Sequence, residues 1–206
     1  MWHKTQFLEE YLQKNNCKTS EYKKVIDIGA YDCAESLKFT SLFPNASVTA
    51  FECNPHLIDK CKVNTNKSDR INLVQKMVTD TPGNTKFNIC GGKFNIYNSA
   101  QSSLCIPKNE EYRTIDVETI RMDEYLGNSK IDFVWIDVQG AELNVLRSFG
   151  SKLKNVSTFY CEVDIMGGRY VSDSTVSTIV DFLNQHRLNL KDARMINPNE
   201  FHLIFG

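Results

Sequence analysis

A near-continuous run of apolar residues that ends in a carboxylate constrains the fold of this chain more than any other feature. The run covers Ile131–Ile136, and it is followed by Asp137, by Gly140 and by a helical pattern with Leu143 and Leu146. Such a run is typical of a parallel strand that is covered on both faces. Ligands of open α/β sheets bind at the carboxyl ends of their strands, so we expect Asp137 to face a binding site. The alternative is that Asp137 only caps the following helix.

A second strand, loop and helix pattern near the start of the chain favours the binding site. Residues 25–36 read VIDIGAYDCAES, in which Gly29 and Ala30 are small enough for backbone to approach a ligand and a helix starts at Ala34. A dinucleotide fingerprint that opened at Gly29 would need glycines where Tyr31 and Ala34 stand. The loop therefore fits a nucleoside cofactor without a pyrophosphate, such as S-adenosylmethionine, better than NAD or FAD.

An acidic residue follows the next expected strand. Residues 47–55 read SVTAFECNP, and Glu52 stands at the carboxyl end of the apolar part. Nucleotide-binding α/β folds place the carboxylate that accepts the ribose hydroxyls about 20 to 25 positions after the first strand. The spacing from Asp27 to Glu52 agrees with that position.

Five segments, in their order and spacing, resemble the FkbM-type S-adenosylmethionine-dependent methyltransferases. They are DIGAYDCAES (27–36), AFECNP (50–55), RMDEYL (121–126), WIDVQGAELNVL (135–146) and CEVD (161–164). The resemblance covers residues 24–186. It departs from the family pattern at Cys33, where glycine is usual, and at Cys53, where proline is usual.

The resemblance implies a Rossmann-like class I methyltransferase, an α/β fold with a seven-stranded, mostly parallel sheet and helices on both faces. We expect one methyltransferase domain over residues 1–206. Residues 1–20 contain an amphipathic helix that covers the sheet or the site. Between residues 86 and 117, strand-like pieces alternate with turn residues, which indicates a β-rich insertion.

The resemblance also assigns cofactor contacts. Asp27 supports the loop or takes the methionine ammonium through water, Glu52 takes the ribose hydroxyls, and Asp137 lies beside the methionine end. A third strand is expected over 71–78, and it would bring Asp80 to where related methyltransferases hold the adenine amino group. The expected cofactor-binding residues are Asp27, Gly29, Ala30, Tyr31, Glu52, Asp80 and Asp137.

Two strand-end acids are the predicted catalytic residues. Methyl transfer from a sulfonium requires the acceptor oxygen about 3 Å from the methyl group and a base that removes its proton. We assign Asp137 and Glu162 to this chemistry. The alternative for Glu162 is an ion pair with Arg147 or Arg169.

The acceptor side is expected around the loop from Met166 to Tyr170, where glycines allow closure and an aromatic ring can stack on a sugar. Ser102 and Ser103 match a family position that faces the site, although a solvated turn explains them equally well. For His202 the alternative is a structural histidine, with its hydrogen bonds made inside one of the last strands of the sheet. The predicted substrate-binding residues are Ser103, Asp164, Arg169, Tyr170 and His202.

The function implied by the resemblance is O-methylation of a sugar hydroxyl in a glycan, with a deoxyhexose such as rhamnose as one acceptor. One alternative is ribose 2'-O-methylation of RNA, in which Asp137 and Glu162 would act with two lysines. Lys152 or Lys154 offers one lysine, and a second is missing near the opening loop. A third possibility is a domain that binds a nucleoside without turnover.

Composition fits a compact enzyme. The 206 residues are 41% hydrophobic and 24% charged, and the net charge of -1 gives no general attraction to nucleic acid. Seven cysteines, odd in number and without a CxxC pair, indicate buried thiols rather than disulfides or a metal site. The N-terminus carries charges throughout and lacks a signal-peptide core. We therefore expect a cytosolic protein without membrane insertion and without a bound metal.

Overall fold

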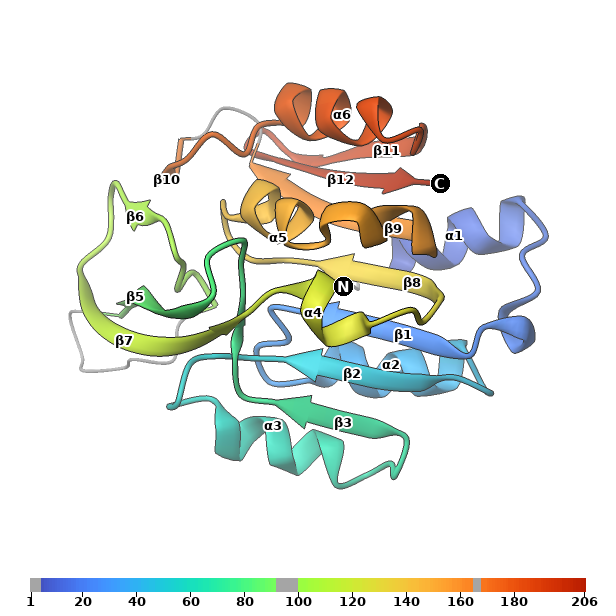
Figure 1. The fold of residues 1–206 in the computed structure, drawn as a ribbon, viewed down its shortest axis with the longest axis horizontal. Helices are drawn as coiled ribbons and strands as arrows, with labels where there is room; N and C mark the ends of the chain where they lie inside the picture. Colours follow the sequence, from blue (N-terminus) through green and yellow to red (C-terminus); the bar gives the residue numbers. More distant parts are fainter. Residues whose placement is uncertain (1–4, 92–99, 165–167) are drawn as a thin grey trace.

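The computed structural model describes residues 5–91, 100–164 and 168–206. Within these ranges a seven-stranded sheet has the order β11-β12-β9-β8-β1-β2-β3 (Figure 1). The strands are β1 (Lys24–Ile28), β2 (Ser47–Phe51), β3 (Ile71–Val74), β8 (Ile131–Ile136), β9 (Val156–Asp164), β11 (Leu190–Asn197) and β12 (Glu200–Phe205). Neighbours from β3 to β9 are parallel, and β12 runs antiparallel to β9 and β11. The predicted mostly parallel, seven-stranded sheet is confirmed.

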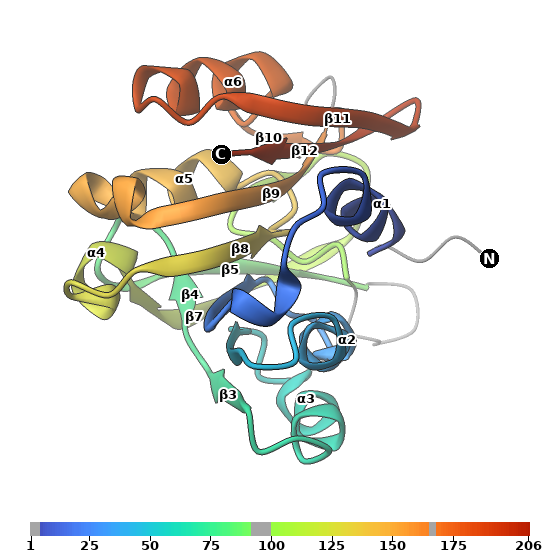
Figure 2. The same ribbon diagram turned by 90° about the vertical axis from the view of Figure 1, so that its right-hand side faces the viewer.

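Helices cover both faces of this sheet, as Figure 2 shows. One face carries α1 (Gln6–Lys14), α2 (Ala34–Leu42) and α3 (Ile58–Thr65), and the other carries α4 (Met122–Leu126), α5 (Glu142–Ser148) and α6 (Val176–Gln185). Short 3₁₀ helices span Thr19–Glu21 and Gly150–Asn155. Because β8 is buried from both sides, its sequence is an apolar run rather than an alternation of polar and apolar residues.

The N-terminal helix covers the sheet. Phe7 of α1 is buried in one cluster with Trp135 and Tyr160, whose rings stack with centroids 3.7 Å apart. The Phe7 ring lies 6.2 Å from the Tyr160 ring. Of the two positions expected for this helix, over the sheet or over the site, the packing shows the first.

Side-chain alternation places the strand-end polar groups on one face. Successive residues of a strand point to opposite faces. Trp135 and Tyr160 belong to the cluster under α1 and α2, whereas Ile136 and Cys161 belong to the cluster under α4 to α6. Two residues after Trp135 and Tyr160 come Asp137 and Glu162, and Asp27 likewise follows Val25 of the α1 cluster. The polar groups therefore extend the α1 side of the sheet to its carboxyl edge.

The insertion is β-rich, as expected, and its strands begin and end a few residues outside 86–117. A three-stranded sheet consists of β4 (Met77–Val78), β7 (Tyr112–Ile120) and β5 (Gly83–Cys90), and a two-stranded one pairs β6 (Ile106–Pro107) with β10 (Tyr170–Val171). Residues 92–99 lie outside the described part. Figure 1 shows β5, β6, β7 and β10 at the left, beside the carboxyl edge of the main sheet.

The third strand ends earlier than expected. Pairing with β2 stops at Val74, and Met77 and Val78 pair instead with β7 of the insertion. The chain thus leaves the main sheet four residues early, because Met77 and Val78, which follow the polar Gln75 and Lys76, belong to the smaller sheet.

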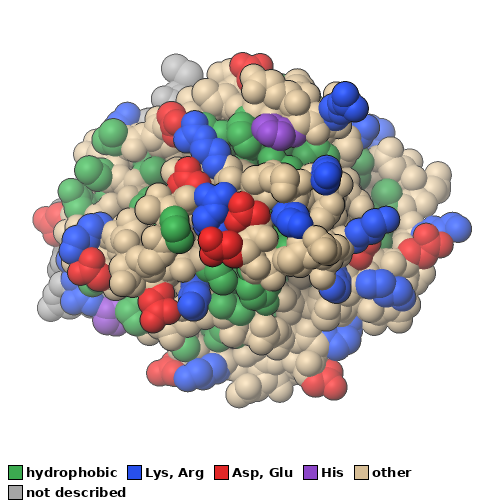
Figure 3. Space-filling view, viewed as in Figure 1, with side chains coloured by type: hydrophobic (Ala, Val, Ile, Leu, Met, Phe, Trp, Pro, Cys, Tyr) green, Lys and Arg blue, Asp and Glu red, His purple; other side chains and the backbone are tan. Residues whose placement is uncertain are grey.

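Charged side chains of both signs are interspersed over the face shown in Figure 3. Among the described residues, we find no helix that combines the length and the apolar character needed to cross a membrane.

The packing of α1 gives a stability prediction. Phe7→Ala removes a ring that is 1% exposed, so the free energy of unfolding should fall by about 3 to 5 kcal/mol in a denaturant titration. Val63→Ala is the control, because Val63 is 64% exposed and its loss should change stability by less than about 0.5 kcal/mol. Equal, small effects of the two substitutions would show that α1 contributes no core packing.

Candidate active site

A cavity of about 390 Å³ opens at the carboxyl ends of β1, β2 and β8. This volume lies in the range of small-molecule sites. The insertion closes it on one side with Phe87, Ser102 and Leu104. Residues predicted to bind the cofactor are among its lining: Asp27, Gly29, Ala30, Tyr31, Glu52 and Asp137.

The loop after β1 is pinned to the neighbouring strands. The amides of Gly29 and Ala30 both donate to the carbonyl of Phe51, each at 3.0 Å. Gly29 has φ +85°, and a Cβ atom there would lie 1.9 Å from the carbonyl oxygen of Asp137. Only glycine fits this position, because any side chain would push apart the loops that follow β1 and β8.

Glu52 is held by backbone amides. Its Oε2 accepts from the amide of Tyr31 at 2.9 Å, and its Oε1 accepts from the amide of Asn54 at 2.7 Å. Burial raises the pKa of Glu52 to about 7 despite these bonds, and the charge of Asp137 adds to the rise. The carboxylate is thus fixed at the cavity wall. Binding of a hydroxyl or a cation there would lower the free energy of its ionised form.

Asp27 lies at the inner end of the same wall. The Ser36 hydroxyl donates to its Oδ2, and Oδ1 has no hydrogen-bond partner among the described residues. Burial raises the pKa of Asp27 to about 8, against the bond from Ser36. An unsatisfied, fully buried carboxylate oxygen at a cavity suits a ligand that brings a donor.

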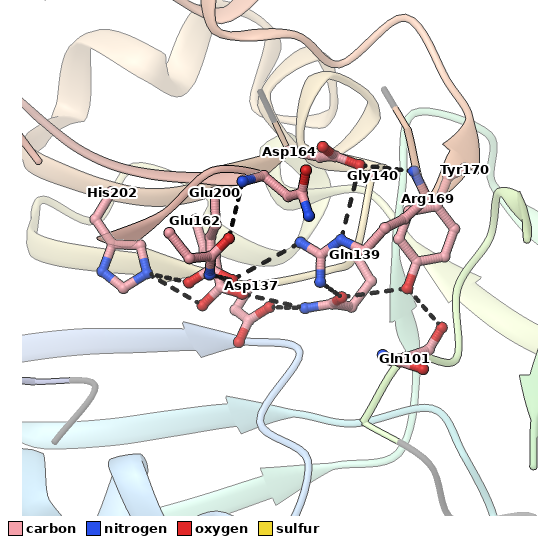
Figure 4. Close-up of polar contacts among 12 residues, drawn as sticks. Gln101, Asp137, Gln139, Gly140, Glu162, Asp164, Arg169, Tyr170, Glu200 and His202 are labelled. Atoms are coloured by element: carbon pink, nitrogen blue, oxygen red, sulfur yellow. Dashed lines mark hydrogen bonds and ion pairs between the residues drawn. The ribbon is translucent and has the colours of Figure 1, made fainter. Parts of the chain in front are cut away.

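The loop after β8 carries Asp137 and a residue that sequence reasoning missed. Gln139 has φ +57°, and its Nε2 donates to Oδ1 of Asp137 at 2.6 Å and to Oε1 of Glu162 at 3.4 Å (Figure 4). The two predicted catalytic acids are therefore brought together through one amide. The prediction that Asp137 faces a site agrees with its place in the cavity wall.

A buried histidine lies behind Glu162. His202 is 0% exposed, and its Nε2 lies 2.8 Å from Oε1 of Glu200 and 3.5 Å from Oε2 of Glu162, while Nδ1 bonds the Tyr160 hydroxyl. Burial alone would lower the pKa of His202, but the hydrogen bonds to Glu162 and Glu200 outweigh it and raise that pKa. His202 lowers the pKa of Glu200 in turn.

This group also has the composition of a cation site. Glu162, Glu200 and His202 each offer one donor atom, and these atoms lie within 4.8 Å of one another. A shared proton on the imidazole accounts for the same arrangement, because it satisfies both carboxylates. The absence of a bound metal, expected from the sequence, stays a prediction.

Arg169 and Tyr170 form the rim beyond Gln139. The amide of Arg169 donates to Oδ2 of Asp164 at 3.0 Å, and its guanidinium lies 3.7 Å from the same carboxylate and 3.9 Å from Glu200. The Tyr170 hydroxyl donates to the carbonyl of Gln101 at 2.8 Å. Glu162 therefore pairs with His202, and the arginine proposed as its alternative partner pairs with Asp164 and Glu200. Arg147, the other candidate, pairs with Asp173.

Ser103 and Asp80 lie in surroundings that differ from those expected from the sequence. Ser103 is 1% exposed, and its hydroxyl donates to the carbonyl of Gln139 at 2.6 Å, so it supports the loop from behind. Asp80 is outside the cavity lining, where it accepts from Asn144 at 3.2 Å and its carbonyl accepts from Arg121 at 2.7 Å. The early departure of the chain from β3 carries Asp80 past the cavity.

The sequence profile of the methyltransferase FkbM domain family matches residues 27–188. The chain belongs to this family. Membership in the FkbM family confirms the resemblance found in the sequence, the Rossmann-like class and S-adenosylmethionine as the cofactor.

One relative and two solved structures extend this comparison. The 2-O-methyltransferase NoeI of Sinorhizobium fredii (strain NBRC 101917 / NGR234) is 31% identical over 150 residues, which are 67% of this chain and 62% of the relative. The chain thus spans less than two thirds of NoeI. Fibrillarin from Aeropyrum pernix with bound S-adenosyl-L-methionine has a TM-score of 0.58 at 10% identity, covering 97% of this chain and 74% of that one. The N-methyltransferase NodS from Bradyrhizobium japonicum WM9 has a TM-score of 0.54 at 10% identity, and the match covers 97% of this chain and 96% of that one. At these identities the two structures show the fold alone.

The cavity fits the cofactor of the FkbM family. S-adenosylmethionine carries an ammonium, a sulfonium and a ribose diol, and the wall offers the carboxylates of Asp27, Glu52 and Asp137. Apolar side chains suited to the adenine ring line the rest, among them Phe51, Leu57, Met77, Val78, Phe87 and Leu104.

The position of Glu52 gives a binding prediction. Glu52→Ala should weaken S-adenosylmethionine binding by about 1 to 3 kcal/mol, the cost of losing a charged hydrogen-bond partner, as measured by calorimetry. NAD should not compete with S-adenosylmethionine for binding to the parent protein. Unchanged affinity in a folded variant would remove Glu52 from the site.

Buried acids give a pH prediction. The pKa values of Asp27, Glu52 and Glu142 are raised to about 8, 7 and 8, mainly by burial, so the folded state binds more protons than the unfolded state above about pH 4. Stability without cofactor should fall as pH rises through the folded pKa values, seen as a lower urea midpoint at about pH 9 than at about pH 5. The raised pKa of His202 likewise lowers stability as pH rises. The lowered pKa of Glu200 affects stability only below this range of pH.

Asp27→Asn is the matched control for that titration. Its amide cannot ionise, so the variant should lose less stability over the same range of pH. Stability that rises with pH in the parent protein would contradict the raised pKa values.

Proposed function

We propose that this chain is an O-methyltransferase that transfers the methyl group of S-adenosylmethionine to a sugar hydroxyl of a glycan. The observation that carries the proposal is the carboxylate pair of Asp137 and Glu162, bridged by the Gln139 amide, with Asp137 in the wall of the cofactor cavity. The name of the relative NoeI, a 2-O-methyltransferase, supports transfer to oxygen. A deoxyhexose such as rhamnose is the acceptor that we propose to test first.

Each acid has a distinct part in this proposal. When bound, the cofactor supplies an electrophilic methyl group on a sulfonium. Asp137 belongs to both halves of the site, because it lines the cofactor cavity and contacts the Gln139 amide. We assign to Asp137 the proton of the acceptor hydroxyl, and to Glu162 the second hydrogen bond that orients that hydroxyl.

The acceptor would enter past the rim. Arg169 is 31% exposed at its side chain, and its contacts with Asp164 and Glu200 hold the guanidinium beside the carboxylate pair. Such a fork of donors suits the hydroxyls of a sugar. The neighbouring Tyr170 is 2% exposed, so in this proposal it supports the rim through its hydroxyl. His202 and Ser103 are too buried to touch an acceptor, so in this proposal they act through Glu162 and Gln139.

Ribose methylation of RNA is the alternative, and the positions of Lys152, Lys24 and Lys38 argue against it. Lys152 donates to Asn128, which precedes β8, so both lie at the amino edge of the sheet, opposite the cavity. Lys24 starts β1 at that same edge, and Lys38 pairs with Glu9. The carboxylates around the site and the mixed charges of Figure 3 also disfavour a phosphate backbone.

A screen for methyl transfer tests the proposal. The protein would be incubated with S-adenosylmethionine and nucleotide sugars, synthetic oligosaccharides or capped RNA, and products would be read by mass. We expect a gain of one methyl group on a saccharide hydroxyl, with EDTA leaving turnover unchanged. Methylation of RNA alone would favour the ribose alternative, and cofactor binding without turnover on any acceptor would favour a nucleoside-binding domain.

The catalytic assignment gives a further prediction. Asp137→Asn should cut turnover by about two orders of magnitude or more, because it removes the base and keeps the size of the side chain. If Asp137 serves mainly as the base, cofactor affinity holds; if it also binds the methionine end, affinity falls as well. Parent-like turnover in this variant together with an inactive Glu162→Gln would transfer the role of base to Glu162.

A further inference from the structure

Gln139 lies at the centre of the polar groups in Figure 4. Its Nε2 donates to Asp137 at 2.6 Å and to Glu162 at 3.4 Å. Its Oε1 accepts from the Tyr170 hydroxyl at 3.2 Å and from Nη1 of Arg169 at 3.5 Å. One side chain therefore joins the carboxylate pair to both residues of the rim.

Only an amide can make this set of contacts. Ionised carboxylates accept and a guanidinium donates, so the group between them needs donors on one side and an acceptor on the other. These partners also fix the orientation of the Gln139 amide, because a flip would turn its oxygen toward two carboxylates. Glutamate in this place would face them without an N–H, and asparagine is shorter by one methylene.

The backbone of Gln139 is built to aim that side chain. Its φ of +57° is uncommon for a residue with a long side chain, so the surroundings must hold it. The Ser103 hydroxyl does this by donating to the Gln139 carbonyl at 2.6 Å. Ser103 is itself fixed by two backbone hydrogen bonds with Asn88 of β5, at 2.8 and 2.9 Å.

Tyr170 connects the same amide to the insertion. Tyr170 pairs with Pro107 of β6, and its hydroxyl donates to the carbonyl of Gln101. A Cβ atom on Gly140, the residue after Gln139, would lie 3.1 Å from the Tyr170 ring. The rim, the insertion and the loop after β8 thus meet at Gln139.

We propose that Gln139 is a positioning residue for methyl transfer, which holds the carboxylates of Asp137 and Glu162 side by side and ties them to the rim at Tyr170. This inference rests on the proposed function, because it assumes that the two acids act on the acceptor. Two carboxylates side by side repel each other, and the N–H donors of Gln139 hydrogen-bond to both. Without those donors the pair would lose its alignment.

Charged groups from every neighbouring element act on this pair. They are Asp27 of β1, Glu52 after β2, Glu142 of α5, Asp164 of β9, Arg169 before β10, and Glu200 and His202 of β12. Most of these groups are acidic. His202 pairs with Glu162, whereas the N–H donors of Gln139 reach both Asp137 and Glu162.

The test compares Gln139→Glu with Tyr170→Phe. Gln139→Glu keeps the shape, removes the donors and adds a charge, so turnover at neutral pH should fall about tenfold or more, with KM for the acceptor little changed. Tyr170→Phe removes the outer bond to Gln139 together with the bond to the carbonyl of Gln101, and it leaves the bonds from Gln139 to the two acids in place. It should raise KM for the acceptor and lower kcat less than Gln139→Glu does.

A readout without turnover separates this inference from the proposed function. Carboxyl carbons of Asp137 and Glu162 can be followed by NMR in labelled protein and identified with Asp137→Asn and Glu162→Gln. We expect both carboxyl signals to shift in Gln139→Glu and to stay within error in Tyr170→Phe. Unmoved signals in a folded Gln139→Glu protein would overturn the role of Gln139, whereas a parent protein without any methyl transfer would overturn only the proposed function.

Discussion

Burial of several carboxylates at one edge of the sheet is the constraint on which the site depends. Asp27, Glu52 and Glu142 are each at most 7% exposed, and burial raises their pKa values into or above the neutral range. Backbone amides offset part of this cost at Glu52 and Glu142, and a hydroxyl does so at Asp27. A ligand that brings positive charge and hydroxyl donors offsets more of it, so cofactor binding and stability are coupled.

The insertion strengthens this coupling. It contributes Phe87, Ser102 and Leu104 to the cavity wall and Ser103 to the support of Gln139. By excluding water it raises the cost of unpaired charge and strengthens each hydrogen bond that remains. Part of the wall that covers the strand-end acids therefore comes from a segment that is separate from those strands in sequence.

How much of the site the sequence could predict depends on how far apart along the chain the contacting residues lie. Asp137 and Glu52 end apolar strands, and their places follow from local pattern and spacing alone. Gln139 was missed because a positive φ and four side-chain contacts leave no trace in hydrophobic periodicity. Asp80 was expected at the cavity because the sequence predicts one strand over 71–78, although these residues are divided between two sheets.

The residues of the acceptor half were harder to predict from the sequence, because their contacts join segments that are distant along the chain. Glu200 begins the last strand, where an acidic residue after a turn is unremarkable, and only pairing with β9 brings it toward Glu162. The burial of His202 was foreseen as the alternative reading of a closing strand. Its hydrogen bonds to two glutamates required the antiparallel register of β12, which the sequence does not specify.

Asp137 joins the two halves of the site through separate parts of one residue. Its amide donates to the carbonyl of Ile28, its own carbonyl packs against Gly29, and its carboxylate accepts from Gln139. The loop after β1 is therefore in direct contact with the backbone of the residue that we assign as base. A cofactor that contacts this loop would bear on the same backbone that positions the Asp137 carboxylate.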